Sequence, residues 1–172
     1  HRMTEPRPRK TGSKPIESIT FDDIDRQILN ILQEDSETPV QAISETVGLS
    51  ANPCWRRIKR MEEAGVIKKR VALVDQARAK VPLTVFIGVS TSRHEIEWLN
   101  QFRDLIDEIP EVVEAYRLTG TVDYILKVIV PDMSSYDAVY KQMIQRLEFS
   151  QVNSMMAMEE LKFTTAIPTN YL

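Results

Sequence analysis

The stretch VGLSANPCWRRIKRMEEAGVI, residues 47–67, decides how the first half of the chain folds. Gly48 suits a tight turn, because a residue without Cβ takes a positive φ at little cost. Ser50 is well placed as an N-cap, and Pro53 is tolerated in the first turn of a helix. Ala64-Gly65 suits the end of that helix. The stretch therefore predicts the turn and second helix of a helix-turn-helix.

The predicted helix has two faces of different character. Cys54, Ile58 and Met61 recur at helical spacing and form an apolar face. The opposite face carries the hydrogen-bond donors Asn52, Arg56, Lys59 and Arg60. In the major groove of DNA, arginine can bind guanine and asparagine can bind adenine. We interpret this face as a DNA reader; the alternative is an ordinary solvated helix in which Glu62 and Glu63 balance the basic residues.

Length and composition are those of a soluble globular protein. The chain has 172 residues, of which 42% are hydrophobic and 27% charged, enough for one or two domains. Its single cysteine, Cys54, lies on the apolar helix face, so we expect a buried structural thiol rather than a redox sensor. No stretch is long and apolar enough to span a bilayer, and none at the start resembles a signal peptide. The sequence therefore predicts a cytoplasmic protein without a membrane partner.

Charged residues are unevenly distributed along the chain. Residues 1–80 contain 15 Lys and Arg against 12 Asp and Glu, whereas residues 81–172 contain 7 against 13. Within the first half, the basic residues concentrate in residues 56–80. This pattern is expected if the first half meets phosphate and the second half meets something else.

Residues 1–18 are rich in Pro, Arg, Lys, Thr and Ser, and we expect a disordered basic tail there. Residues 19–74 are expected to form a winged helix-turn-helix domain. Its first helix begins at Asp22-Asp23 and its second at Thr38-Pro39. Residues 66–74, VIKKRVALV, alternate in polarity and predict a β-hairpin, the wing. The basic residues at the tip of this hairpin are Lys68, Lys69 and Arg70.

The predicted DNA contacts come from the recognition helix and the wing. The helix enters the major groove, while the wing and Arg57 approach the DNA backbone. Trp55 has two possible roles, stacking on sugar-phosphate or packing against the wing. The residues expected to contact DNA are Ser50, Asn52, Pro53, Trp55, Arg56, Arg57, Lys59, Arg60, Lys68 and Lys69.

A polar linker at residues 75–82 is expected to separate this domain from residues 83–172. In the second domain we expect strands at 83–91, 112–119 and 122–130, a last strand within 151–165, and helices at 95–109 and 134–147. The order β-α-β-β-α-β predicts a ferredoxin-like fold, with an antiparallel four-stranded sheet and two helices on one face. The whole chain is therefore predicted to be of the α+β class.

Both faces of the predicted sheet need burial, because its strands carry apolar residues at odd and even positions. Two helices cover only one face. We expect the other face to pair with a second copy, giving a dimer that meets two half-sites on DNA. The residues of the last strand that we expect to be largely buried are Val152, Met156, Met158 and Leu161.

A winged helix-turn-helix followed by a βαββαβ domain resembles the Lrp/AsnC family of bacterial and archaeal regulators. The resemblance covers about residues 21–168. Its motifs are FDDIDRQILNIL (21–32), VGLSANPCWRRIKRMEEAGVI (47–67), LTGTVDYILKV (118–128) and ELKFTTAIP (160–168). Each motif alone is weak, and their order and spacing together make the resemblance specific.

The resemblance implies a transcriptional regulator that binds double-stranded DNA and responds to an amino acid or a related metabolite. In that family the second domain is RAM/ACT-like, dimers form through the sheets and often assemble into octamers, and the effector occupies a cleft between dimers. Amides around Gly120 can bind a carboxylate and Asp123 can pair with an ammonium; the alternative is a turn glycine and a capping aspartate. The residues implied in effector binding are Gly120, Thr121, Val122, Asp123, Tyr124, Ser154 and Met156.

Near the start of the last strand the sequence departs from the family pattern. Ser154 stands where the family usually has threonine, so a hydroxyl is retained. Met155, Met156 and Met158 are less typical, and their adaptable thioethers either suit a bulkier or apolar effector or fill the core.

Two other functions fit the predicted architecture. One is a ligand-independent architectural protein that bends or compacts DNA. The other is an enzyme, since siroheme decarboxylase subunits share the two-domain arrangement. The sequence has only two histidines, His1 and His94, and it shows no His/Cys cluster, nucleophile–base pair or phosphate-binding glycine loop. We therefore expect no enzymatic activity, no metal and no cofactor.

Overall fold

The computed structural model describes residues 19–172, so the expected basic tail lies outside the described residues. The chain divides into two compact units. The first unit extends to Ala72 and also includes Phe163–Leu172, while the second unit is Leu73–Lys162. The sequence places the whole of residues 83–172 in one domain, whereas in the structure the last part of the chain belongs to the unit that contains the helix-turn-helix.

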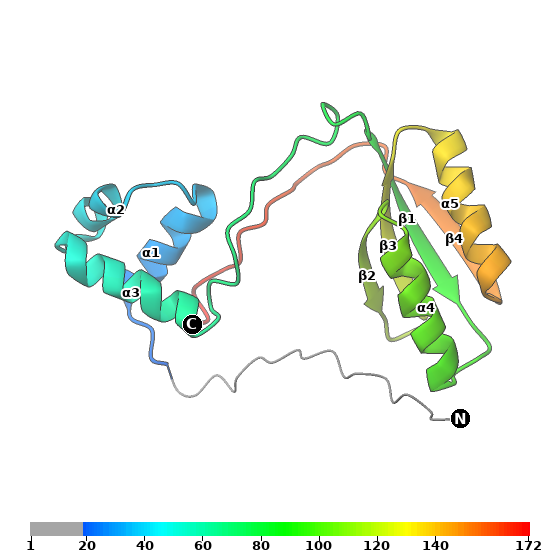
Figure 1. The fold of residues 1–172 in the computed structure, drawn as a ribbon, viewed down its shortest axis with the longest axis horizontal. Coiled ribbons are helices and arrows are strands. Elements are labelled where there is room, and N and C mark those ends of the chain that lie inside the picture. The colour runs from blue at the N-terminus through cyan, green and yellow to red at the C-terminus, as the bar shows by residue number, and fades with distance from the viewer. Residues whose placement is uncertain (1–18) are drawn as a thin grey trace, which may run out of the picture. The chain divides into compact units, whose positions relative to one another are not determined.

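Three helices form the first unit: α1 (Asp23–Glu34), α2 (Val40–Val47) and α3 (Ala51–Glu63), as the sequence predicts (Figure 1). At the start of α1, the Asp22 carboxylate accepts a hydrogen bond from the Asp25 amide at 2.9 Å, and the Asp25 carboxylate accepts one from the Asp22 amide at 3.2 Å. Gly48, with φ of 74°, ends α2 in the left-handed region that the turn requires. Ser50 occupies the N-cap position of α3, but its side chain makes no capping hydrogen bond.

Two kinds of contact hold α3 in the first unit. On one side Cys54, Ile58 and Met61 are buried in the apolar core, as their spacing predicts. On the other, Asp25 of α1 is only 1% exposed and binds two guanidinium groups of α3. Its oxygens lie 3.0 Å from an Arg57 nitrogen and 2.7 Å from an Arg60 nitrogen. Because a buried carboxylate is costly without a partner, these two arginines tie the orientation of α3 to α1.

The expected wing is not a β-hairpin. Residues 66–74 contain no strand, and Arg70 donates to the Ser36 carbonyl at 2.8 Å and pairs with Glu62 at 3.1 Å. A hairpin needs a tight turn, and the run KKRVALV contains no Gly, Asn, Asp or Pro to form one. The alternation that suggests a hairpin belongs to one extended segment, in which Val71, Leu73 and Val74 are exposed.

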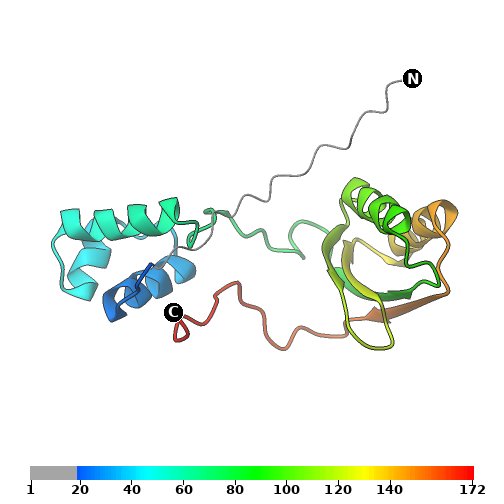
Figure 2. The same ribbon diagram turned by 90° about the horizontal axis from the view of Figure 1, so that it is seen from below.

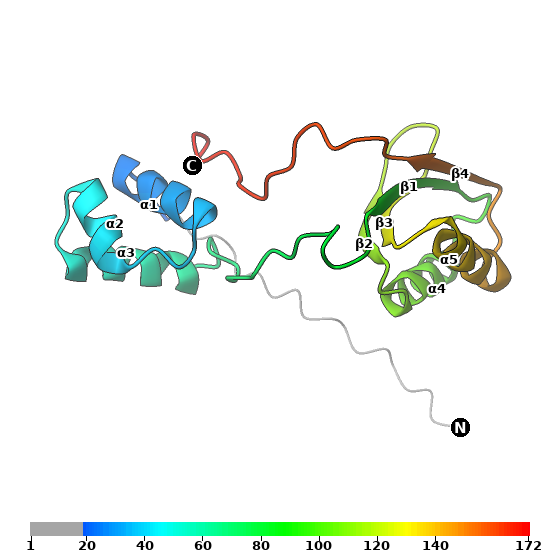
Figure 3. The same ribbon diagram turned by 90° about the horizontal axis from the view of Figure 1, so that it is seen from above.

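The second unit has the predicted βαββαβ order and a single antiparallel sheet with strand order β2-β3-β1-β4. Figures 2 and 3 show both helices on the same face of this sheet. Its elements are β1 (Leu83–Ser90), α4 (Ile96–Glu108), β2 (Val112–Arg117), β3 (Tyr124–Val130), α5 (Met133–Arg146) and β4 (Gln151–Met156).

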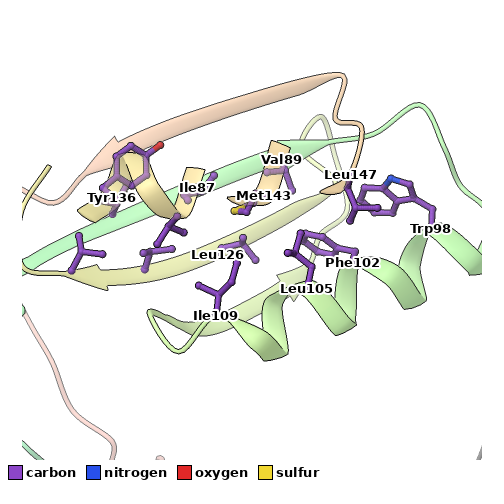
Figure 4. Packing of buried hydrophobic residues seen from close by; sticks show 14 residues of the cluster. Ile87, Val89, Trp98, Phe102, Leu105, Ile109, Leu126, Tyr136, Met143 and Leu147 are labelled. Atoms are coloured by element: carbon purple, nitrogen blue, oxygen red, sulfur yellow. The ribbon is translucent and has the colours of Figure 1, made fainter. Parts of the chain in front are cut away.

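The core of this unit lies between the sheet and the two helices. Alternate residues of β1 and β3 point toward the helices and are fully buried: Val85, Ile87, Val89, Leu126, Val128 and Val130. Figure 4 shows Phe102 and Leu105 of α4 and Met143 of α5 packed against them. The predicted ferredoxin-like fold is therefore confirmed, with its apolar core on one side of the sheet.

The face of the sheet that turns away from α4 and α5, here called the open face, is covered by no helix of the described part of the chain. Phe86, Ile125 and Ile129 are half-buried there, and Tyr116 and Met155 are 57% and 52% exposed. The strands thus carry apolar residues on both faces of the sheet, as expected, but a single subunit fully buries only those that point toward the helices.

The expectation that the last strand, within residues 151–165, includes a largely buried apolar set up to Leu161 is wrong for one subunit. β4 ends at Met156, because β1, its pairing partner, begins only two residues beyond the Val85–Met156 pair. Met156, Met158 and Leu161 are 40%, 94% and 87% exposed, and only Val152 is half-buried.

The buried carboxylate of Asp25 leads to a test of stability. Asp25→Ala should lower the free energy of unfolding by about 2 kcal/mol, because it removes the charged hydrogen bonds to Arg57 and Arg60 and the acceptor of the Asp22 amide. Asp23→Ala is the matched control: its side chain is 91% exposed and among the described residues pairs with Arg26 alone, so the loss should stay below about 1 kcal/mol. Urea unfolding followed by circular dichroism measures both, and equal losses would show that Asp25 does not hold α3 in place.

Candidate DNA interface and ligand-binding loop

The outer face of α3 presents polar and basic side chains to solvent. Asn52, Trp55, Arg56 and Lys59 are all exposed. The Arg56 side chain makes no hydrogen bond or ion pair with any other residue in the part of the chain that the structure describes. Its guanidinium group is therefore available to an external acceptor, and its planar fork suits the paired acceptors on a guanine edge.

Trp55 lies on the surface beside this face. Its ring is 50% exposed, and the Lys59 ammonium lies 5.6 Å from the ring centroid, a cation–π contact. Lys59 also lies 3.4 Å from the Glu62 carboxylate. With no hairpin to pack against, the Trp55 ring remains accessible to a flat or apolar partner. Pro53 and Ser50 at the start of α3 are exposed as well.

The sequence predicts that Arg57 and Arg60 contact DNA, but in the structure both side chains bind carboxylates of the first unit. Arg57 binds Asp22 at 2.7 Å as well as Asp25, and Arg60 binds Asp25. The hydrogen bond from Arg57 lowers the pKa of Asp22 to about 2, so this carboxylate remains charged at neutral pH. Both arginines thus serve the packing of α3 on α1.

The remaining basic residues of the predicted interface follow α3. Lys68 and Lys69 are exposed, and neither forms an ion pair with a described residue.

Cys54 lies on the inner face of α3 and is fully buried. Burial raises the pKa of its thiol, which stays protonated. The expectation of a buried thiol is confirmed.

The loop between β2 and β3 is tied to the end of β1. Leu118 donates to the Asp123 carbonyl at 2.8 Å, and Gly120, with φ of 109°, allows the chain to turn between them. The Asp123 amide donates to the Val89 carbonyl at 3.1 Å, and its carboxylate accepts from the Thr91 amide at 2.9 Å. The Asp123 carboxylate therefore anchors the loop, while the amides of residues 120–122 form no backbone hydrogen bond to described residues.

The residues implied in effector binding are brought together only in part. Val122 packs over Gly88 on the open face, where a Cβ on Gly88 would lie 3.2 Å from a Val122 methyl. Ser154 pairs with Ile87 in the sheet, points toward the helices and hydrogen-bonds the Tyr136 hydroxyl. In one subunit the loop and the Ser154 side chain thus lie on opposite faces of the sheet.

Tyr124 belongs mainly to the core rather than to a binding surface. Its ring centroid lies 4.9 Å from that of Phe102 and 5.8 Å from that of Trp98. Thr91 hydrogen-bonds Asp123, and Tyr136 hydrogen-bonds Ser154. The sequence does not predict either residue as part of the effector site. No local motif marks either residue, because each meets its partner only through the register of the sheet.

Within residues 19–172, no three His, Cys, Asp or Glu side chains come together in a way that could hold a metal ion. Among the same residues, no helix combines the length and the apolar character needed to cross a membrane.

Comparison with known proteins covers both units. A winged helix-turn-helix DNA-binding model matches residues 21–68, and the Lrp/AsnC ligand binding domain matches residues 84–167. The glutamate uptake regulatory protein of Zymomonas mobilis is 44% identical over 148 residues, 86% of this chain and 90% of that protein.

Two solved structures extend the likeness to the whole fold. An AsnC family transcriptional regulator from Agrobacterium tumefaciens is 51% identical with a TM-score of 0.85, covering 88% of this chain and 99% of that chain. A transcriptional regulator from Neisseria meningitidis in complex with L-methionine is 32% identical with a TM-score of 0.84 and the same coverage. The chain therefore belongs to the Lrp/AsnC family of transcriptional regulators, with a winged helix-turn-helix DNA-binding domain and a C-terminal ligand-binding domain.

Proposed function

We propose that α3 reads DNA sequence through Asn52 and Arg56 and that Lys59 assists at its outer edge. The observation that supports this most is the exposed Arg56 guanidinium, which has no partner among residues 19–172 and stands one helical turn from Asn52. An arginine and an asparagine on one exposed helix face match the donor and acceptor pattern of a guanine and an adenine.

Contacts with phosphate and sugar would position the helix. We assign this role to Lys68 and Lys69 after α3, and to Ser50, Pro53 and Trp55 near its start, since all five are exposed. Arg57 and Arg60 would contribute by keeping α3 in its orientation, because their guanidinium groups bind α1 carboxylates.

Assembly is proposed to occur through the open face. Phe86, Ile125 and Ile129 carry apolar surface there that no helix among residues 19–172 covers, and a second copy would cover it in a two-fold dimer. The dimer would present two α3 helices to two half-sites. We propose that these dimers assemble further into an octamer or a similar ring.

The effector is proposed to be an amino acid. Asp123 carries a half-buried carboxylate beside the unbonded amides of residues 120–122, which offers an acceptor for an ammonium and donors for a carboxylate. The relatives point the same way: one is a glutamate uptake regulator, and another was solved with L-methionine. Because Ser154 and Met156 lie apart from the loop in one subunit, a site built from all of them would take them from different copies.

A ligand-independent protein that bends or compacts DNA is the second candidate, supported by the same α3 surface. A thermal-shift screen against the amino acids separates the two, since a ligand that binds the native state raises the melting temperature. No shift with any amino acid would favour the architectural function.

The assignment of DNA contacts predicts two different losses. Arg56→Ala should weaken binding to the specific site by about 1–3 kcal/mol and have little effect on random DNA, whereas Lys69→Ala should weaken both similarly. Arg78→Ala is the matched control, because that side chain is 87% exposed and lies outside the first unit. Fluorescence anisotropy with both DNAs measures the constants, and equal losses for Arg56→Ala on the two DNAs would contradict its role as a reader.

The effector site predicts a change at Asp123. Asp123→Asn keeps an acceptor for the Thr91 amide but removes the charge, so the amino acid that shifts the wild type should bind roughly 10- to 100-fold more weakly. Asp137→Asn, in an exposed pair with Lys141 on α5, is the control and should bind normally. Isothermal titration calorimetry gives the affinities. An unchanged affinity in Asp123→Asn would move the ligand elsewhere.

A further inference from the structure

One face of α1 is occupied by the end of the chain. Arg26, Asn30 and Gln33, spaced four and three residues apart, share this face, which we call the α1 stripe. Gln33 donates to the Ile167 carbonyl at 3.0 Å and accepts from the Ile167 amide at 2.6 Å. Thr169 donates to the Asn30 side-chain oxygen at 2.9 Å, and Arg26 donates to the Leu172 carbonyl. Figures 2 and 3 show this end of the chain beside α1.

The contact with Gln33 recognises backbone rather than a side chain. A primary amide that gives one hydrogen bond to a residue and takes one from it replaces the pairing that a neighbouring strand would provide. The Ile167 side chain accordingly stays 71% exposed. Two local turns shape the segment: the Ala166 amide donates to the Thr164 hydroxyl at 3.0 Å, and the Leu172 amide donates to the Thr169 carbonyl at 3.2 Å.

The chain connects the first and second units twice. The backbone leaves the first unit between Ala72 and Leu73 and re-enters it between Lys162 and Phe163. Six residues, 157–162, connect the re-entering segment to β4, the strand that carries Ser154 and Met156. A domain held by one flexible connection samples many orientations, and a second connection reduces that number.

We propose that the α1 stripe is a docking site for residues 166–172 of the same chain and that this docking is a second tether between the two units. The tether restricts the DNA-binding unit, so that the two α3 helices of a dimer engage two half-sites together. The consequence for DNA rests on the proposed dimeric binding, whereas the docking itself does not.

Hydrogen exchange at the Ile167 amide tests the docking in the full chain. In the wild type this amide should be protected, and Gln33→Ala should speed its exchange at least about tenfold, because the Gln33 oxygen is its acceptor. Gln27→Ala is the matched control on the same helix: the Gln27 side chain is exposed and forms no hydrogen bond to a described residue, so its removal should leave the rate unchanged. Exchange at the rate of an unstructured peptide in the wild type would overturn the proposal.

Crosslinking decides which copy supplies the segment. Asn30→Cys with Thr169→Cys places two thiols where the side chains meet, while Cys54 is fully buried. A short bis-maleimide should then join the two cysteines within one chain, which a denaturing gel and peptide mapping will show. Linkage between two chains would show that the stripe holds a second copy and would overturn the tether within one chain.

DNA binding tests the tether itself. The probe is a fragment selected by the protein from random sequence, compared with a fragment that carries only half of it. Gln33→Ala should weaken binding to the full fragment by about tenfold and leave the half fragment unchanged, because only joint engagement depends on the tether. Equal weakening on both would overturn the tether. A wild type that binds both fragments equally would instead contradict the dimeric binding proposed above, and the exchange rates would still decide the docking.

Discussion

A single buried carboxylate decides how the DNA-binding unit is arranged. Asp25 is 1% exposed in α1, and removing such a charge from water costs several kcal/mol unless partners compensate. Arg57 and Arg60 of α3 provide that compensation, and Asp22 adds a second acceptor for Arg57. The guanidinium–carboxylate contacts of 2.7 to 3.0 Å are directional, so they add an orientational restraint to the packing of α3 in the apolar core. The exposed direction of Arg56 follows from this restraint.

Features that depend on local sequence are predictable here. Helical spacing places Cys54, Ile58 and Met61 in the core, and the turn at Gly48 follows from its missing Cβ. The βαββαβ order likewise yields the correct sheet, since few ways of connecting such elements exist. The same spacing turns Arg60 outward, yet its side chain is long enough to reach back to a buried partner that the helix alone does not reveal.

Features that depend on distant partners are not predictable from one sequence. Residues 66–74 alternate as a hairpin does, but without a turn residue they remain one extended segment. Met158 and Leu161 look like core residues, yet β4 has ended before them, since only two residues of β1 remain beyond the Val85–Met156 pair. The β2–β3 loop shows the same division: Gly120 and Asp123 stand out in the sequence, whereas Thr91 and Tyr136 enter the implied site only through the fold.

The use of arginines for packing also limits how strongly one DNA-binding unit can hold DNA. Of the basic residues from Arg56 to Lys69, Arg57 and Arg60 are neutralised by α1 carboxylates, and Lys59 is partly shared with Glu62. Arg56, Lys68 and Lys69 then supply most of the free positive charge. Three or four phosphate neutralisations change the logarithm of affinity by roughly 3 to 4 per tenfold change in salt, well below the values of strong binders. A unit with so few free cations therefore needs a second copy on the same DNA, and a sheet whose open face demands a partner fits that requirement.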